Sequence, residues 1–290
     1  MKIAATNQGT FLDYISVLKP RETFLLTFIG VCSAIIAAGI VGYLPTEVVI
    51  LSLLAIGLGS AGSNGLTNYL DREADARMAR TRNRALAAGR IDPPQKALPL
   101  IIGLIVVALA LAWVLHPMCF LFGLIGVIAS AIWRKTISCT FLGIVAGCSP
   151  VLIGWFAVKP VFDIQILLLC CLVAIWTPIH VWSVMVANRE DYLGAGLNYF
   201  PLSLQDKNVV KILFSLSVLL YLVAIIIYLT ADFHLLYLVV ANILGILMIY
   251  ANARLLRSTT SKTAWQIYKL SAFPYLGIIF LTMCLDTWLI

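Results

Sequence analysis

Two acidic side chains stand one helical turn apart at the end of a long apolar segment. Asp71 and Asp75 are separated by four residues, so on a helix they project from one face, about 6 Å apart along its axis. Asn64 and Asn68 continue the same stripe into the apolar segment. Two neighbouring carboxylates repel each other unless a cation lies between them, and magnesium prefers one or two carboxylates with phosphate oxygens and water. The spacing therefore predicts a magnesium site.

Arginines follow this acidic pair within two or three turns. Arg80, Arg82 and Arg84 carry planar guanidinium groups that suit phosphate oxygens. Acids for a metal beside bases for phosphate are typical of a diphosphate site. The alternative is an interfacial collar, because the arginines alone would also bind anionic lipid. Acidic residues add little to membrane topology, so Asp71 and Asp75 favour the diphosphate interpretation.

A second acidic group follows another apolar segment, with Asn188, Glu190, Asp191 and Tyr192 close together. It resembles the first group in kind, and two such groups facing one another could hold magnesium around one diphosphate. Glu190 as a solvated loop charge is the alternative. His180 lies inside the preceding apolar segment, where a histidine is a functional candidate, although a helix–helix hydrogen bond would also explain it.

The elements that must position these residues are membrane-spanning helices. Apolar residues make up 62% of the 290 residues and charged residues 11%, against about 45–50% and about 25% in soluble domains. Backbone amides in hydrocarbon must be satisfied within their own segment, which requires helices. The sequence predicts an all-α membrane bundle of about nine transmembrane helices with cytoplasmic loop caps, as one domain over residues 1–290. The expected spans are 23–43, 48–69, 97–115, 118–133, 139–158, 164–187, 209–229, 233–255 and 264–289.

Charge predicts the orientation of this bundle. Nine spans place 19 of the 20 lysines and arginines on the side of the N-terminus, and Lys159 on the other. The positive-inside rule assigns the first side to the cytoplasm. We expect a multi-pass integral membrane protein, in the plasma membrane if the cell is prokaryotic, with the N-terminus and the long loops 70–96 and 188–208 cytoplasmic. This distribution of the net charge of +7 argues against nucleic acid, and seven cysteines without a CxxC pair indicate no zinc site.

Residues 68–75, continuing to Ile91, resemble the first aspartate-rich motif of the UbiA-type membrane prenyltransferases, and within that superfamily the protohaem IX farnesyltransferase (haem O synthase) family most closely. Further similar segments are Lys19-Pro20-Arg21, Arg134-Lys135-Thr136, Gly143–Trp155, Trp176–Trp182 and Glu190-Asp191-Tyr192. The likeness runs from about residue 18 to residue 202. Later helices agree in number only.

One position and two short segments depart from the pattern of that family. Thr67 stands where the superfamily usually has an asparagine four residues before the first aspartate, so Asn64 or Asn68 would substitute, or Thr67 would bind metal through water. Residues 136–139 and 197–199 also differ from the usual haem O synthase segments.

The resemblance implies a UbiA-type fold and Mg²⁺-dependent transfer of a farnesyl group from farnesyl diphosphate to the vinyl group of haem B. The product would be the hydroxyethylfarnesyl haem, haem O. Substrates would come from the lipid bilayer environment, and a haem-modifying or oxidase-assembly partner would take the product. The expected catalytic residues are Asp71, Asp75, Asp191, Arg80 and His180. The expected metal ligands are Asp71, Asp75, Asp191 and Asn68. The expected substrate-binding residues are Asn64, Asn68, Arg21, Arg84, Arg134, Lys135, Asn188 and Tyr192.

Two other interpretations stay open on sequence. One is a prenyltransferase of the same type with another acceptor, such as an aromatic acid, a chlorin or a glycerol-phosphate lipid. The other is a transporter of an anionic substrate. A transporter predicts charged or helix-breaking elements near the bilayer midplane, often in repeated halves. No charged residue lies near the centre of spans 23–43, 48–69, 139–158 and 209–229.

Overall fold

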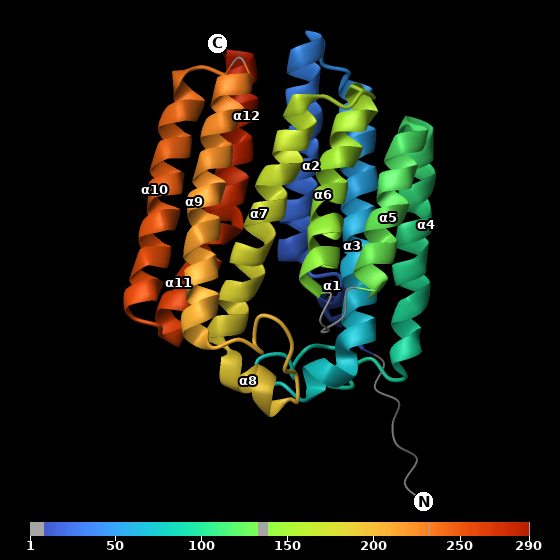
Figure 1. The fold of residues 1–290 in the computed structure, drawn as a ribbon. Helices are drawn as coiled ribbons and strands as arrows, with labels where there is room; N and C mark the ends of the chain where they lie inside the picture. The colour runs from blue at the N-terminus through green and yellow to red at the C-terminus, as the bar shows by residue number, and fades with distance from the viewer. Residues whose placement is uncertain (1–8, 133–138, 232, 290) are drawn as a thin grey trace, which may run out of the picture.

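The computed structural model describes residues 9–132, 139–231 and 233–289, and the regular structure within these ranges is helical (Figure 1). The elements are α1 (Phe11–Val17), α2 (Pro20–Val41), α3 (Thr46–Ala76), η1 (Pro94–Ala97), α4 (Leu98–Leu115), α5 (Pro117–Ile132), α6 (Cys139–Val158), α7 (Ile164–Ala187), α8 (Arg189–Gly194), α9 (Asp206–Thr230), α10 (Leu235–Arg257), α11 (Ser261–Leu270), η2 (Ser271–Gly277) and α12 (Ile278–Leu289).

The membrane-spanning character of the bundle agrees with the sequence. Among the described residues, eight helical segments are long and apolar enough to cross a membrane, and α5 is a shorter apolar helix of 16 residues. Together they match the expected number of about nine. The last span is compound, because α11 passes through a π-helix, η2, before it continues as α12.

α3 is longer than a membrane requires, and this length positions the acidic pair. Its 31 residues rise about 46 Å at 1.5 Å per residue, against a hydrocarbon thickness of about 30 Å. The expected loop 70–96 therefore begins later, since its first residues continue α3 as far as Ala76. Asp71 and Asp75 stand on this projecting end.

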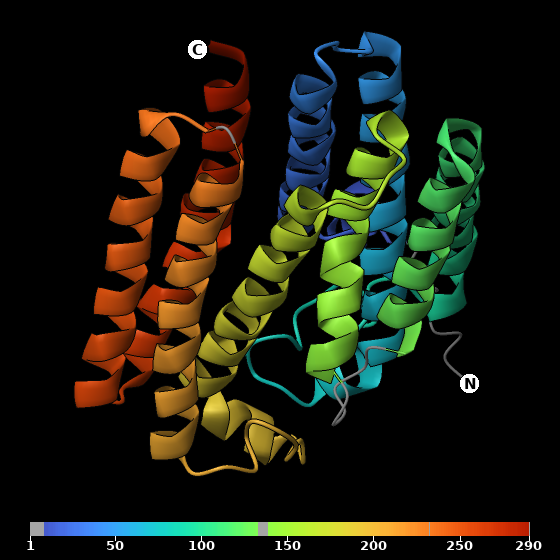
Figure 2. The ribbon, with the colours of Figure 1, turned by 45° about the horizontal axis from the view of Figure 1, so that its top comes forward.

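The polar connections gather at one end of the bundle. Figure 1 shows α1, α8 and the segment after α3 toward one end of the bundle, with the end of α12 at the other. Figure 2 shows α9, α10 and α12 on one side of the bundle, α4 and α5 on the other, and α2, α3, α6 and α7 between them. Both acidic groups therefore lie at the same end of the central helices.

Close packing of small residues joins α2 to α6 at the centre. A Cβ atom on Gly154 would lie 1.9 Å from the carbonyl oxygen of Gly30. Small residues at helix crossings in membranes allow backbones to approach this closely. The crossing fixes the two helices that form one wall of the cavity described below.

Gly154→Ala is expected to destabilise the protein by about 1–3 kcal/mol, as overpacking of a filled core does. Thermal unfolding in detergent, followed by tryptophan fluorescence, would show a lower Tm. The matched control is Gly103→Ala on α4, where a Cβ would meet no atom within 4 Å. Equal Tm values for the two variants would contradict this packing.

Candidate active site

A cavity of about 330 Å³ opens at the end of the bundle that carries the acidic groups. Its mouth is lined by charged and aromatic side chains, namely Lys19, Asp71, Arg80, Arg84 and Tyr192. Along α3 the lining residues recur every fourth position from residue 71 back to residue 55. Sixteen helical residues span about 24 Å, so the cavity extends from this mouth deep into the apolar bundle.

One branch of the cavity lies between α3, α4, α5 and α6, and we call it the α4–α5 wing. It is lined by Gly59, Ala108, Ala112, Gly123 and Ile153. Small and aliphatic side chains leave a narrow space without charged groups. This surface suits a flexible hydrocarbon chain.

The other branch lies between α2, α7 and α11, and we call it the α7–α11 wing. It is lined by Leu25, Trp176, His180, Val184 and Tyr268. Flat aromatic rings dominate its wall. Both wings belong to the one cavity that opens at the charged mouth.

The two carboxylates of the acidic pair have different surroundings. Asp71 is half-buried and lines the cavity. Asp75 is 1% exposed, and its Oδ2 accepts a hydrogen bond of 2.7 Å from Arg84 Nη1. The pair therefore combines one acid on the cavity wall with one acid that anchors a cavity-lining arginine.

The two asparagine side chains that extend this stripe also differ in their surroundings. Asn64 lines the cavity and donates from Nδ2 to Thr23 Oγ1 at 3.0 Å. Asn68 is buried, and it donates from Nδ2 to the Val17 carbonyl at 2.6 Å and accepts from Arg84 at 3.4 Å. Thr67 lines the cavity and donates to the Ser63 carbonyl. Asn64 and Thr67, rather than Asn68, thus reach the cavity.

Asp191 joins the two acidic segments. Its carboxylate accepts hydrogen bonds from the backbone N–H groups of Ala79 at 2.6 Å and Arg80 at 3.1 Å. Arg80 Nη2 also donates to Tyr192 Oη at 3.3 Å. The structure therefore brings the α8 segment against the segment that follows α3, and Asp191 contacts backbone amides there, outside the cavity lining.

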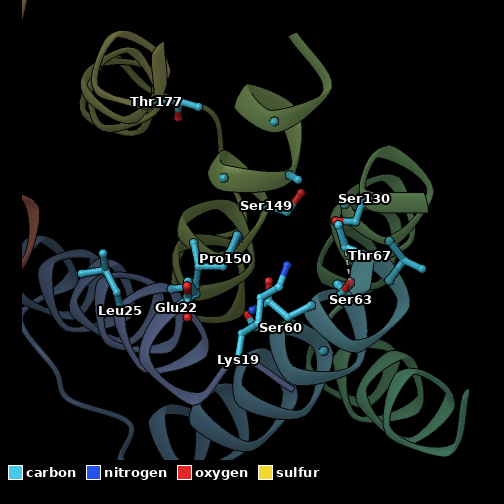
Figure 3. A pocket seen from close by; sticks show the side chains of 18 of the residues that line it. Lys19, Glu22, Leu25, Ser60, Ser63, Thr67, Ser130, Ser149, Pro150 and Thr177 are labelled. Atoms are coloured by element: carbon cyan, nitrogen blue, oxygen red, sulfur yellow. Dashed lines mark hydrogen bonds between the residues drawn. The ribbon is translucent and has the colours of Figure 1, made fainter. Parts of the chain in front are cut away.

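Lys19 is a cavity residue that sequence reasoning missed. It precedes α2 with φ 48°, a left-handed conformation that is unusual for a residue other than glycine. Figure 3 shows its side chain extending toward a space bordered by Ser63, Thr67 and Ser149. Burial, with Arg84 nearby, lowers the pKa of Lys19 to about 8. Arg21, the expected residue of the same motif, is exposed and does not line the cavity.

His180 forms part of an aromatic stack in the α7–α11 wing. Its ring stacks on Trp176 with centroids 4.8 Å apart and on Tyr268 at 4.6 Å. Its Nδ1 lies 2.9 Å from Ser271 Oγ at the start of η2. Tyr268 and Ser271 belong to a region without a recognisable motif, so only the hydrophobic period of the last span could have indicated them.

The remaining expected residues lie elsewhere. Asn188 ends α7, and its Nδ2 donates to the Val184 carbonyl of the same helix at 2.7 Å. It does not line the cavity. Arg134 and Lys135 fall outside the described residues.

The donor set at the mouth suits magnesium only when a phosphate takes part. Among the described residues, no three histidine, cysteine or acidic side chains are grouped to hold a metal ion by themselves. Magnesium commonly keeps several waters and takes one or two carboxylates plus substrate phosphates. Asp71 on the cavity wall, with the Asn64 and Thr67 side chains beside it, fits this partial protein coordination.

The helices, the cavity and the charges together describe a helical membrane protein whose apolar cavity opens at a charged mouth. Comparison with protein families agrees, because the UbiA prenyltransferase family matches residues 22–276. The chain belongs to the UbiA prenyltransferase family.

Individual relatives extend this result. The chain is 33% identical to the protoheme IX farnesyltransferase of Desulforudis audaxviator over 97% of this chain and 90% of that protein. It is 32% identical to protoheme IX farnesyltransferase 1 of Picrophilus torridus, over 92% and 91% of the two chains.

Solved structures share the fold. A digeranylgeranylglyceryl phosphate synthase matches with a TM-score of 0.77 at 18% identity, covering 96% of this chain and 99% of that one. A UbiA homolog from Archaeoglobus fulgidus bound to GPP and Mg²⁺ matches with a TM-score of 0.67 at 16% identity, over 93% and 99% of the chains.

Proposed function

We propose that this chain transfers a farnesyl group from farnesyl diphosphate to the vinyl group of haem B, giving haem O, in a Mg²⁺-dependent reaction. The observation that carries this proposal is the placement of Asp71, Lys19, Arg80 and Arg84 around the mouth of a long apolar cavity. The relatives named protoheme IX farnesyltransferase support the choice of donor and acceptor.

The charged mouth would stabilise the departing diphosphate. Negative charge builds on this leaving group as the allylic carbon–oxygen bond breaks, and fixed cations in a dry site stabilise such charge. Lys19, Arg80 and Arg84 supply positive charge. Mg²⁺ held by Asp71 would add further positive charge at the phosphate oxygens. Asp75 and Asp191 lie at the same end of the bundle and would add negative charge that attracts the cation.

The two wings would separate donor from acceptor. The α4–α5 wing would hold the isoprenoid chain, because its wall is narrow and free of charged groups. The α7–α11 wing would hold the flat acceptor against Trp176, His180 and Tyr268. Exclusion of water by the α4–α5 wing would protect the allylic cation, which the faces of the aromatic rings in the α7–α11 wing also attract.

The membrane setting follows from the same arrangement. We propose that the mouth faces the cytoplasm, in the plasma membrane of a prokaryotic cell, because the lysines and arginines concentrate at that end. Farnesyl diphosphate would present its head group to this mouth and its chain to the bundle. The haem product would pass to a haem-modifying or oxidase-assembly partner.

The test of this function is purified protein in lipid vesicles, supplied with farnesyl diphosphate, Mg²⁺ and either haem B or an aromatic acid. Mass spectrometry should detect the hydroxyethylfarnesyl haem. Prenylation of the aromatic acid with unmodified haem would overturn the haem acceptor and keep the prenyltransferase. No prenylation of either, together with movement of the diphosphate across the vesicle membrane, would favour a transporter.

The floor of the α4–α5 wing should set the preferred isoprenoid length. Ala112→Leu is expected to shift the ratio of kcat/KM for geranyl over farnesyl diphosphate upward by about tenfold or more, because one or two methylenes in an apolar pocket are worth about 10–200-fold. The control is Ala110→Leu, at an exposed position of the same helix. An unchanged ratio in Ala112→Leu would show that the isoprenoid chain binds outside the α4–α5 wing.

A further inference from the structure

Two side chains of α7 form hydrogen bonds with Ser271. Trp176 donates from Nε1 to the Ser271 carbonyl, and His180 Nδ1 lies 2.9 Å from Ser271 Oγ. Ser271 is 0% exposed and is the first residue of η2, where the regular hydrogen bonding of α11 gives way to a π-helix. Local π-helix in an α-helix is frequent at functional sites.

The hydrogen bonds of Ser271 favour one tautomer of His180. A serine hydroxyl has one proton, and Ser271 Oγ donates it to the Tyr268 carbonyl at 3.0 Å. With that proton on the Tyr268 carbonyl, Ser271 Oγ accepts from His180, and Nδ1 is the protonated nitrogen. In the neutral ring Nε2 then carries a lone pair.

The surroundings of the His180 ring leave one edge open. Trp176 covers one face and Tyr268 stacks on the ring as well, while Ser271 occupies the Nδ1 edge. His180 nevertheless lines the cavity. Among the residues that the structure describes, none makes a hydrogen bond with Nε2. The edge that carries Nε2 is therefore the part of the ring directed at the α7–α11 wing.

We propose that Ser271 is a positioning residue that holds His180 as the Nδ1–H tautomer, so that Nε2 accepts a proton from water during the transfer. This inference rests on the proposed function, whose product carries a hydroxyl group that neither substrate supplies. Water must therefore add, and a base that accepts its proton accelerates this addition.

The step balances in atoms and electrons. The bond between the first farnesyl carbon and the diphosphate oxygen breaks, and its electron pair leaves on the diphosphate. The π electrons of the vinyl group form the new carbon–carbon bond, which leaves positive charge on the carbon next to the porphyrin ring. The oxygen of water bonds to that carbon, and its proton moves to His180 Nε2.

The tautomer can be tested without any turnover. In protein with isotope-labelled histidine in micelles, the nitrogen NMR signals that disappear in His180→Gln belong to His180. They should show the Nδ1–H tautomer in the wild type and a shift toward Nε2–H in Ser271→Ala. Ser183→Ala is the matched control, because Ser183 is equally buried and bonds the His180 carbonyl rather than its ring. An Nε2–H signal in the wild type would overturn the inference.

The base role requires a second measurement, the division of products in a single turnover. In His180→Gln the amount of hydroxylated product per diphosphate released should fall about tenfold or more relative to the wild type, since general bases contribute 10²–10⁴-fold. In Ser271→Ala the hydroxylated product should fall about fivefold, which corresponds to the contribution of one hydrogen bond. The remaining product of these variants should be prenylated haem that has lost a proton instead of adding water.

Three results would overturn the base role. The first is an unchanged product division in His180→Gln. The second is a loss in Ser183→Ala equal to that in Ser271→Ala. The third is loss of an iron-ligand band in the haem spectrum of His180→Gln, which would make Nε2 a ligand of the acceptor's iron. Because the NMR signals need no substrate, failure of the proposed function would leave the tautomer result standing.

Discussion

Asp71→Asn is expected to lower the rate of prenyl transfer by about 10²–10³-fold, the range seen when one group that stabilises developing charge is removed. The asparagine keeps the shape of the half-buried side chain on the cavity wall but carries no negative charge to attract a divalent cation. Single-turnover formation of prenylated haem, measured by mass spectrometry, checks this expectation.

The matched control for this variant is Glu73→Gln on the same helix. Glu73 has a side chain that is 83% exposed, and among the described residues it forms an ion pair with the neighbouring Arg72. It should keep wild-type turnover, and both variants should insert and unfold like the wild type. A rate for Asp71→Asn close to that of Glu73→Gln would show that the assigned metal ligand is wrong.

Lys19→Met is expected to raise the KM for farnesyl diphosphate by about 10–100-fold, because a hydrogen bond to a charged group contributes about 1.5–3 kcal/mol. Methionine keeps the length and apolar stem of lysine without its charge. Initial rates over a range of donor concentration measure this effect. Lys96→Met is the control, because Lys96 bonds the Asp92 carbonyl at the same end of the bundle and does not line the cavity.

The charge of Lys19 also predicts a pH dependence. With its pKa at about 8, the amine is protonated below that pH and neutral above it, so kcat/KM for the donor should fall as the pH rises through about 8. Lys19→Arg should move this fall to higher pH, because a guanidinium group stays protonated. If kcat/KM falls at the same pH in Lys19→Arg as in the wild type, the titration of another group causes the fall.

Spacing along the sequence predicted the local arrangement of the acidic pair. The four-residue interval placed Asp71 and Asp75 on one helix, since α3 continues to Ala76. The interval contains no information on long-range partners, however, so the ion pair of buried Asp75 with Arg84 was not predictable. The contact of Asp191 with the amides of Ala79 and Arg80 likewise depends on how two distant segments meet.

Other parts of the site depend on backbone geometry that the residue types do not reveal. Lys19 reaches the cavity through a left-handed backbone conformation, whereas the regular first turn of α2 exposes Arg21. Ser271 contacts His180 at the start of the η2 distortion. Hydrophobic composition predicted the spans well, because lipid requires helices, but it does not specify which face of each helix meets its neighbours.

The most direct measurement of the central claim compares single turnovers with and without Mg²⁺. Wild-type protein stripped of divalent cations should form no prenylated haem and release no diphosphate, and added Mg²⁺ should restore both. Asp71→Asn should respond to Mg²⁺ only weakly. Equal rates in stripped and Mg²⁺-supplied wild type, or full rescue of Asp71→Asn at ordinary Mg²⁺ concentration, would contradict the proposal that acidic side chains at this mouth gather the cation that draws diphosphate from the isoprenoid.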